Sequence, residues 1–226
     1  MKKTELIQEI REAAIIAIIR GVEHEKLPPL LDALAAGGIR FAEITFDQTG
    51  RISGEKTAQS IAELKKHMAG RMHIGAGTVM TVGQADRAMT AGAEFLISPN
   101  VNPEVIRHTV AAGCVSIPGA MTPTEAAVAY ESGADFVKLF PADTLGLSYI
   151  KALMAPLSHI PFLAVGGVNE RNIGDFLATG LAGVGVGSAL TPIEWIANES
   201  YQQITEHANR YCNVVQNHRN YFGKRA

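Results

Sequence analysis

Cysteine is scarce in this 226-residue sequence, which contains only Cys114 and Cys212. Two cysteines so far apart give neither a disulfide framework nor the closely spaced ligands of a metal site, and this usage is typical of a reducing cytosol. The seven histidines show no metal-binding spacing either. We therefore expect no metal, no cofactor and a cytoplasmic location.

Long apolar runs and an excess of charge of one sign are also missing. No segment reaches the roughly 18 apolar residues that span a bilayer. Residues 1–20 carry three glutamates and lack the small-residue cleavage site of a signal peptide. The net charge is −2, with Lys and Arg scattered among Asp and Glu. These features predict neither a membrane partner nor a nucleic-acid partner.

What the sequence does contain is a recurring unit, in which an alanine-rich helical stretch ends at glycine and an apolar run follows. Residues 34–38, Leu-Ala-Ala-Gly-Gly, precede the apolar run 41–45 in this way. Glycine ends a helix well because it accepts the left-handed backbone conformation. Eight apolar runs are predicted to be strands: 14–19, 41–45, 73–76, 95–98, 114–118, 136–140, 162–165 and 182–186.

Helical patterns lie between these runs, and several begin with a capping residue and proline, as at Asn102-Pro103. Eight alternating units predict an α/β fold, a single-domain (β/α)8 TIM barrel. The alternative is an open doubly wound sheet, but no glycine-rich dinucleotide motif follows the first strand. The predicted helices between the strands are 25–36, 54–68, 82–91, 103–112, 123–132, 149–156 and 170–179, with a loop at 145–147.

The single domain is assigned to residues 1–226, with a short N-terminal helix, the barrel at about 14–190 and a helical tail at about 192–221. We expect the tail to pack on the barrel and to help cover its bottom or form a subunit contact. The inner face predicted for the tail consists of Trp195, Ile196, Ile204, Tyr211 and Val215.

Lys138 interrupts an otherwise apolar run, residues 136–140. An ammonium group in a strand buried on both faces is costly, and burial lowers the pKa of lysine. An amine that is neutral near pH 7 attacks carbonyl carbon, which is how Schiff-base enzymes begin. Taken alone, residues 136–140 favour the interpretation that Lys138 stands at the end of a strand, with its alkyl stem buried and its amine in water. The other features of the sequence favour a buried, nucleophilic lysine instead.

Glu43 is a second ionisable residue in an apolar run, on the same side of its strand as Phe41 and Thr45. The structural interpretation is a Glu43–Lys138 salt bridge inside the barrel. The functional interpretation, which two such residues on separate strands favour, is a general acid/base whose pKa is raised by burial. The two strands face each other across the ring, so contact requires both long side chains or an intervening water.

Glycines follow the last two predicted strands, as Gly166-Gly167 and as Gly187, which precedes Ser188. In TIM barrels the loops after these strands frequently bind phosphate, because glycine lets backbone N–H groups approach the oxygens. Ser188 adds a hydroxyl donor. The alternative is that these glycines only form tight strand-to-helix turns.

Four further residues end predicted strands and are expected at the same mouth of the barrel. Arg20 ends the first strand and is interpreted either as a carboxylate ligand or as part of a surface ion pair. Thr78 follows the third strand, whereas Pro99 and Pro118 end the fourth and fifth and are expected to shape the pocket wall. His73 begins a strand and is interpreted as a hydrogen-bonded barrel residue.

Six short motifs occur in a characteristic order over about 16–190, most of the chain. They are Glu43-Ile44-Thr45, Gly75-Ala76-Gly77-Thr78-Val79, Ser98-Pro99-Asn100, Pro118-Gly119, Lys138-Leu139-Phe140-Pro141 and Gly166-Gly167-Val168. In this order the sequence resembles the bacterial 2-keto-3-deoxy-6-phosphogluconate / 4-hydroxy-2-oxoglutarate aldolases. The resemblance implies a metal-independent class I aldolase on a (β/α)8 barrel, with a small keto acid as substrate and a homotrimeric assembly.

The resemblance also implies a role for each matching residue. Lys138 matches the Schiff-base lysine and Glu43 the general acid/base, whereas Thr78 matches a residue that holds the pyruvyl carboxylate. Gly166, Gly167 and Ser188 match the phosphate site. The implied reaction cleaves 2-keto-3-deoxy-6-phosphogluconate to pyruvate and glyceraldehyde 3-phosphate.

Two departures from the family pattern bear on the substrate. Many members carry a carboxylate-binding arginine where this chain has Asp47, so that task passes to Arg20. The family also often has threonine where this chain has Val165. The alternatives are therefore 4-hydroxy-2-oxoglutarate or a galactonate-derived epimer as substrate, a non-aldolase phosphate-binding barrel enzyme, or a sugar-phosphate sensor.

Overall fold

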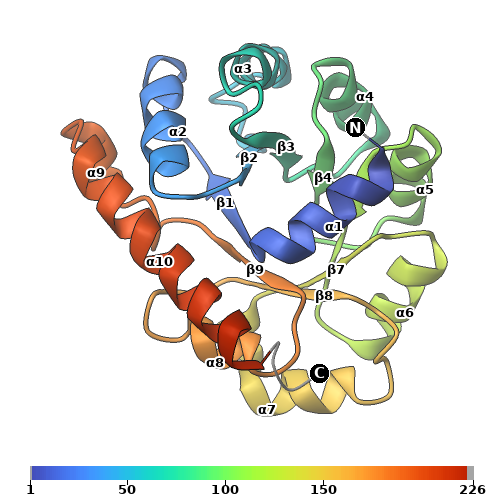
Figure 1. Cartoon of the computed structure of the whole chain (residues 1–226). Coiled ribbons are helices and arrows are strands. Elements are labelled where there is room, and N and C mark those ends of the chain that lie inside the picture. The colour runs from blue at the N-terminus through green and yellow to red at the C-terminus, as the bar shows by residue number, and fades with distance from the viewer. Residues whose placement is uncertain (1, 223–226) are drawn as a thin grey trace.

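The structure, a computed structural model, describes residues 2–222, and the side chains of 219–222 are outside the description. Residue 1 and residues 223–226 of the predicted domain therefore lie outside the described residues. Figure 1 looks along a central ring of strands that is surrounded by helices, with α1 (Lys3–Ala13) lying across the end nearest the viewer. The predicted single-domain barrel is confirmed.

The strands form one parallel sheet in the order β5-β4-β3-β2-β1-β9-β8-β7-β6. The eight predicted runs all contain a strand, but the fifth ends before Pro118, which has no N–H to donate to a ladder, and a short ninth strand that was not predicted follows this proline. Because β5 and β6 are consecutive in the chain and pair with β4 and β7, the ring closes at this proline. The strands are β1 Ile15–Ile19, β2 Phe41–Thr45, β3 His73–Gly77, β4 Phe95–Ile97, β5 Val115–Ile117, β6 Gly119–Ala120, β7 Val137–Leu139, β8 Phe162–Val165 and β9 Gly183–Val186.

The helices follow the strands as predicted, with two differences. The predicted loop at 145–147 is present only as a kink, because α7 consists of two helical segments that meet at Gly146, whose φ of 75° and ψ of 157° are not helical. The tail is two helices rather than one, with a break between residues 197 and 201. The helices after α1 are η1 His24–Lys26, α2 Leu27–Ala36, α3 Gly54–His67, α4 Val82–Thr90, α5 Pro103–Ala111, α6 Pro123–Glu131, α7 Ala142–Met154, α8 Ile173–Leu177, α9 Ile193–Ala197 and α10 Tyr201–Phe222.

Apolar side chains form two separate layers. One layer lies between the strands and the outer helices, and the other fills the inside of the barrel. Alternation along the strands explains the division: Val137 and Leu139 belong to the outer layer, whereas Phe136 belongs to the inner one. Lys138 lies between the two outward-facing residues and therefore points into the barrel.

The bottom of the barrel is covered by α1, not by the tail. Leu6 and Ile10 of α1 join the inner apolar layer, where burial of each contributes about 1.5–3 kcal/mol. The tail packs on the outer wall instead, because α10 contacts α2 and α8. Its predicted inner face is confirmed: four of the five residues are buried and Trp195 packs against the core.

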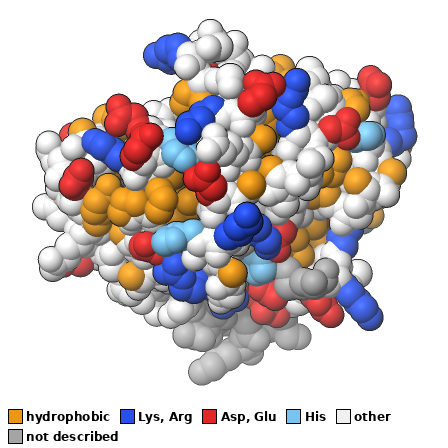
Figure 2. Space-filling view, turned by 90° about the horizontal axis from the view of Figure 1, so that it is seen from above, with side chains coloured by type: hydrophobic (Ala, Val, Ile, Leu, Met, Phe, Trp, Pro, Cys, Tyr) orange, Lys and Arg blue, Asp and Glu red, His pale blue; other side chains and the backbone are white. Residues whose placement is uncertain are grey.

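No helix within residues 2–222 has the length and apolarity needed to cross a membrane. Figure 2 shows one side of the molecule, where Lys and Arg side chains lie among Asp and Glu side chains. Over the same described residues, no cluster of three or more His, Cys, Asp or Glu is arranged to hold a metal ion.

Candidate active site

A cavity of about 1000 Å³ opens at the carboxyl ends of the strands. Glu43 is buried behind the cavity wall rather than in it, and Pro118 is not among the lining residues. The Pro118 carbonyl instead accepts a hydrogen bond from the Lys138 backbone N–H at 2.8 Å, so this proline supports the strand beside it. The sequence-predicted residues that line the cavity are Arg20, Thr78, Pro99, Lys138, Gly166, Gly167, Gly187 and Ser188.

Lys138 is held in the wall of this cavity by β7, paired with Gly119 of β6. The residue is only 6% exposed, and its Nζ lies 4.8 Å from the centre of the Phe140 ring. Burial lowers the pKa of Lys138, and the charge of Arg20 adds to this effect, whereas Glu43 opposes it. The cavity thus presents an amine whose neutral, nucleophilic form is favoured over that of an ordinary lysine.

Glu43 is 1% exposed, and its carboxyl group packs against Gly77 of β3. A side chain at Gly77 would collide with that carboxyl group, so the glycine makes room for the acid. Burial raises the pKa of Glu43 to about 7, although Lys138 and Arg20 both act to lower it. A carboxyl group with a pKa near neutrality can both donate and accept a proton, as a general acid/base must.

No ion pair or hydrogen bond joins Glu43 to Lys138, although both belong to the described part of the chain, and Glu43 Oε2 has no hydrogen-bond partner. The salt-bridge interpretation is therefore wrong. Leaving a buried carboxyl oxygen unpaired is costly, and such groups gather at functional sites. Burial dominates the pKa shifts of both groups, and the charge of each group opposes the shift of the other.

Arg20 and Thr78 form a polar pair at the same mouth. Arg20 follows β1, and its Nη2 donates to the Thr78 hydroxyl at 3.3 Å. Among residues 2–222 Arg20 makes no ion pair with an acidic side chain, so its interpretation as part of a surface ion pair is wrong. A guanidinium group beside a hydroxyl is well suited to bind a carboxylate.

Asp47 does not enter the cavity. Its carboxylate accepts hydrogen bonds from the N–H of Thr49 (2.9 Å), the hydroxyl of Thr49 (2.7 Å) and the N–H of Ile52 (3.0 Å). The hydrogen bonds from Thr49 contribute most to lowering the pKa of Asp47 to about 2. Asp47 therefore stabilises the loop between β2 and α3 instead of lining the cavity.

The glycine loops lie on one wall of the cavity. Gly166 and Gly167 have φ values of 97° and 70°, which residues with side chains rarely adopt. The Gly167 carbonyl accepts hydrogen bonds from the side-chain amides of Asn169 (3.1 Å) and Asn172 (3.0 Å), which fixes the loop after β8. With the exposed Ser188, these backbone segments form a surface suited to an anion.

Sequence reasoning missed two features of this site. Phe140 lines the cavity and contacts the amine of Lys138, and the alternation that places both on one side of the strand was the available signal. Gln48, from the β2–α3 loop, donates to the Thr78 carbonyl at 3.2 Å, and no sequence pattern indicates that contact.

Comparison with known proteins gives three concordant results. The sequence profile of the KDPG and KHG aldolase family matches residues 6–207. The probable 2-dehydro-3-deoxy-6-phosphogalactonate aldolase of Rhizobium meliloti (strain 1021) is 40% identical over 180 residues, 79% of this chain and 82% of the relative. The 2-dehydro-3-deoxy-phosphogluconate aldolase of Treponema pallidum (strain Nichols) is 33% identical over 211 residues, 93% of this chain and 97% of the relative.

A solved structure agrees with these sequence relatives. The KDPG aldolase of Legionella pneumophila, with pyruvate captured at low pH as a covalent carbinolamine intermediate, superposes with a TM-score of 0.81 at 29% identity. The match covers 92% of this chain and 97% of that one. Profile, sequence relatives and structure together show that this chain belongs to the KDPG and KHG aldolase family.

Proposed function

We propose that this protein is a class I aldolase that cleaves a 2-keto-3-deoxy-6-phospho sugar acid, namely 2-keto-3-deoxy-6-phosphogluconate, to pyruvate and glyceraldehyde 3-phosphate. The observation that carries the proposal is a buried, unpaired Lys138 near a buried Glu43 whose Oε2 has no partner, at the mouth of a parallel barrel. The family membership supports the same chemistry.

The first half of the reaction makes a Schiff base. The neutral Nζ of Lys138 attacks the C2 ketone of the substrate and forms a carbinolamine. Glu43, in its protonated form, donates a proton to the leaving hydroxyl group, which departs as water and leaves a protonated imine. The pKa of about 7 keeps both forms of Glu43 populated near neutral pH.

The second half breaks the carbon–carbon bond. The Glu43 carboxylate removes the proton of the C4 hydroxyl, the C3–C4 bond breaks, and its electron pair moves into the imine to give an enamine. Glyceraldehyde 3-phosphate leaves with the new carbonyl group at the former C4. Protonation of the enamine at C3 and hydrolysis of the imine then release pyruvate and regenerate Lys138.

The remaining residues hold the two charged ends of the substrate. Arg20 and the Thr78 hydroxyl bind the carboxylate beside the reacting ketone, supported by their 3.3 Å hydrogen bond. The glycine loops and Ser188 bind the phosphate at the other end, supported by their place in the cavity wall. Fixing both ends orients the scissile bond between Lys138 and Glu43.

The galactonate-derived epimer is the second candidate substrate. The observation that favours it is Val165, which lines the cavity without a hydroxyl group, and the Rhizobium meliloti relative carries the corresponding name. Cleavage rates with the gluconate and galactonate acids and with 4-hydroxy-2-oxoglutarate, coupled to pyruvate detection, rank the candidates. A Val165→Thr variant should change the ratio of the two epimer rates, because its hydroxyl adds a hydrogen-bonding group to the cavity wall.

Borohydride reduction in the presence of pyruvate tests the covalent step. The expected result is a reduced pyruvyl adduct on Lys138, seen by peptide mass. An unmodified Lys138 under saturating pyruvate would refute covalent catalysis and favour a phosphate-binding barrel enzyme of another class. An adduct without cleavage of any keto acid would favour the sugar-phosphate sensor.

We further propose a cytoplasmic homotrimer. The cytoplasmic location is supported by the cysteine usage, and the trimer by the family resemblance and by an exposed apolar patch formed by Met121, Phe140 and Tyr149. These residues lie together because Phe140 N–H bonds the Ala120 carbonyl and the Tyr149 hydroxyl bonds the Met121 carbonyl. Light scattering should give a trimer mass that Met121→Asp reduces; a monomeric wild type would contradict the proposal.

A further inference from the structure

Gln48 joins two loops at the mouth of the barrel without reaching the cavity. It is an exposed residue of the β2–α3 loop, and its Nε2 donates to the Thr78 carbonyl in the next loop at 3.2 Å. Its Oε1 accepts a hydrogen bond from Gln84 Nε2 at 3.4 Å. Because Gln84 also accepts from the N–H groups of Met80 and Thr81, the side chain of Gln48 is tied to a loop that is itself fixed.

Asp47 fixes the backbone from which the Gln48 side chain extends. The three hydrogen bonds from Thr49 and Ile52 to the Asp47 carboxylate close the β2–α3 loop into a turn. An aspartate carboxylate that accepts from the N–H two residues further on mimics a backbone turn, and this restricts the conformation of the neighbouring residues. The residue that immediately follows Asp47 is therefore held toward the β3–α4 loop, where Thr78 lies.

Thr78 needs such support because its backbone is strained. Its φ is 58°, a left-handed conformation that a β-branched residue rarely adopts. Strained residues persist only where their surroundings fix them, and they gather at functional sites. Around Thr78, Gln48 holds the carbonyl, Arg20 donates to the hydroxyl at 3.3 Å, and the N–H of the following Val79 donates to Ile97 at 3.1 Å.

We propose that Gln48 is a positioning residue for the carboxylate of the keto acid. It holds the Thr78 carbonyl, and through Thr78 it sets the hydroxyl and the Arg20 guanidinium in the place where the carboxylate binds. Gln48 itself is directed away from the substrate, because its amide nitrogen donates to the Thr78 carbonyl and its oxygen accepts from Gln84. The inference rests on the proposed function, since it assumes that the carboxylate of a 2-keto acid binds at Arg20 and Thr78.

The test is the concentration dependence of borohydride trapping in the variant Gln48→Met. Methionine has nearly the same length but no amide donor, and the exposed position tolerates it without unfolding. The pyruvate concentration that gives half-maximal trapping should rise about two- to tenfold, the range that corresponds to one lost neutral hydrogen bond. The maximal trapping rate should stay close to that of the wild type, because Lys138 and Glu43 are untouched.

Acetone, a ketone without a carboxylate, separates positioning from general damage. Its half-maximal concentration should be the same in Gln48→Met and in the wild type, so that the selectivity for pyruvate over acetone falls. The matched control is Gln59→Met, an exposed glutamine of α3 whose amide donates to Glu63 instead. In this control variant the half-maximal concentrations of both pyruvate and acetone should equal those of the wild type.

The outcomes distinguish this inference from the proposed function. If the wild type gives no adduct with pyruvate, the proposed function fails and the inference falls with it. If the wild type is trapped and Gln48→Met retains the wild-type dependence on pyruvate, only the inference is overturned. An equal rise in the half-maximal concentrations of pyruvate and acetone would also overturn the inference, because Gln48 would then support the fold rather than the carboxylate site.

Discussion

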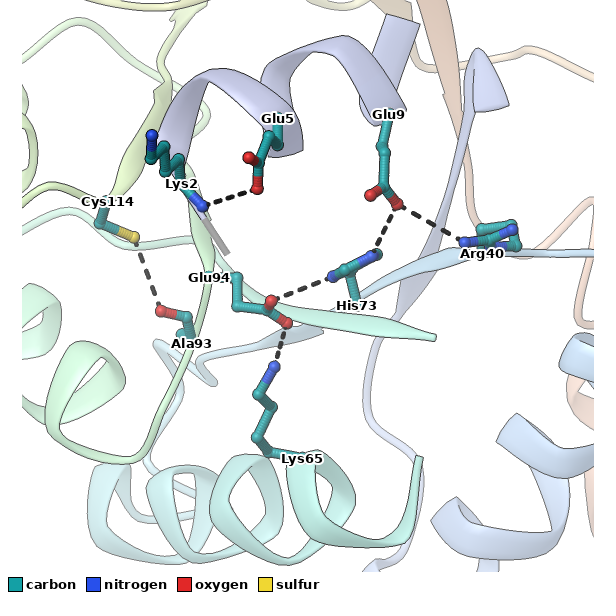
Figure 3. Close-up of polar contacts among 9 residues, drawn as sticks. All are labelled: Lys2, Glu5, Glu9, Arg40, Lys65, His73, Ala93, Glu94 and Cys114. Carbon is teal, nitrogen blue, oxygen red and sulfur yellow. Dashed lines mark hydrogen bonds and ion pairs between the residues drawn. The ribbon is translucent and has the colours of Figure 1, made fainter. Parts of the chain in front are cut away.

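Ionisable side chains are paired with one another at the bottom of the barrel, where they are partly exposed, and are not paired at its mouth, where they are buried. At the bottom, the two ring nitrogens of His73 each lie 3.0 Å from a carboxylate oxygen, one of Glu9 and one of Glu94, and Lys65 pairs with Glu94 (Figure 3). Arg40 adds a longer contact of 3.5 Å to Glu9. Glu9, Arg40, Lys65, His73 and Glu94 each have a partner here that can carry the opposite charge, and these contacts tie α1 to β3 and to the start of β4.

At the mouth, by contrast, Glu43 and Lys138 are deeply buried and do not pair with each other. The pKa values differ accordingly. Burial opposes ionisation of Glu94, but hydrogen bonds from His73 and Lys65 outweigh it and lower the pKa of Glu94. For Glu43 burial wins and raises the pKa to about 7. The paired groups at the bottom tie the fold together, whereas the buried groups at the mouth, which lack such partners, mark a candidate functional site.

Replacing one lysine at each end gives the largest expected contrast. Lys138→Met should lose nearly all aldol cleavage and all borohydride-trapped adduct, because Lys138 is the one lysine among the described residues that line the cavity. Lys65→Met should keep full activity and lose only about 0–1 kcal/mol of unfolding free energy, as expected for a half-exposed ion pair. Coupled pyruvate detection and urea unfolding measure the two effects. Comparable activity losses in both variants would break the comparison.

The matching exchange of carboxyl groups should show the next largest effect. Glu43→Gln should slow cleavage by about 10²–10⁴-fold, because the amide cannot transfer the proton. Glu94→Gln should leave the rate unchanged and lower the unfolding free energy by about 1–3 kcal/mol, since it weakens two charge-assisted hydrogen bonds. A slowdown of less than about tenfold in Glu43→Gln would remove Glu43 from the acid/base role.

The unfolding free energy should depend on pH through Glu43 at the mouth of the barrel and through His73 at the bottom. In the folded protein the pKa of Glu43 is about 7, against an ordinary value of 4.5, so its ionisation opposes folding. Relative to Glu43→Gln, the wild type should lose about 3 kcal/mol of unfolding free energy as the pH rises from 4.5 to above 7. Unfolding curves in urea at pH 4.5, 6 and 8 measure this difference, and a pH-independent difference would contradict the raised pKa.

His73 gives the complementary result at the bottom. Its hydrogen bond with Glu94 is the main cause that raises its pKa above 6.5, so protonated His73 favours the folded state. This contribution is fully present below pH 6.5 and is lost as the pH rises through the raised pKa. His73→Gln should therefore be less stable than the wild type at pH 5.5, with a smaller deficit at pH 9.

The smallest expected effect concerns two serines. Ser188→Ala should raise KM for phosphorylated acids about tenfold while leaving unphosphorylated acids nearly unchanged, because a hydrogen bond to a charged group is lost. Ser132, at the end of α6 away from the mouth, already donates to the Val128 carbonyl at 2.7 Å. Ser132→Ala should change neither KM. If Ser188→Ala raised KM equally for phosphorylated and unphosphorylated acids, the phosphate would have to bind elsewhere.

Much of this architecture was predictable from local patterns. The glycine that ends a helical stretch and the apolar run that follows predicted five of the strands, and apolar runs alone predicted three more, because these features depend on backbone conformation and burial. The pattern failed where one residue alters the geometry. Pro118 divides a strand, since it lacks an N–H, and Gly146 interrupts α7 without ending it.

Some residues of the site were likewise predictable from the sequence and others were not. Lys138 and Glu43 were recognisable because a charge in a buried strand is conspicuous in any sequence. Asp47 was misleading, because an aspartate in place of an arginine looks like a change of charge in the pocket. Its hydrogen bonds to Thr49 and Ile52 show that it folds a loop instead. Gln48 carried no signal, because its contact with Thr78 joins residues 30 positions apart.

The sequence by itself determined the repeating βα pattern, the place of Lys138 in a buried strand and the family, because each depends on short-range periodicity or on the identity of residues within short motifs. Only the tertiary structure decided that Glu43 stays unpaired, that α1 rather than the tail covers the bottom, and that Gln48 supports Thr78. These properties depend on which side chains meet across the ring and between loops, and chain order does not specify such distances.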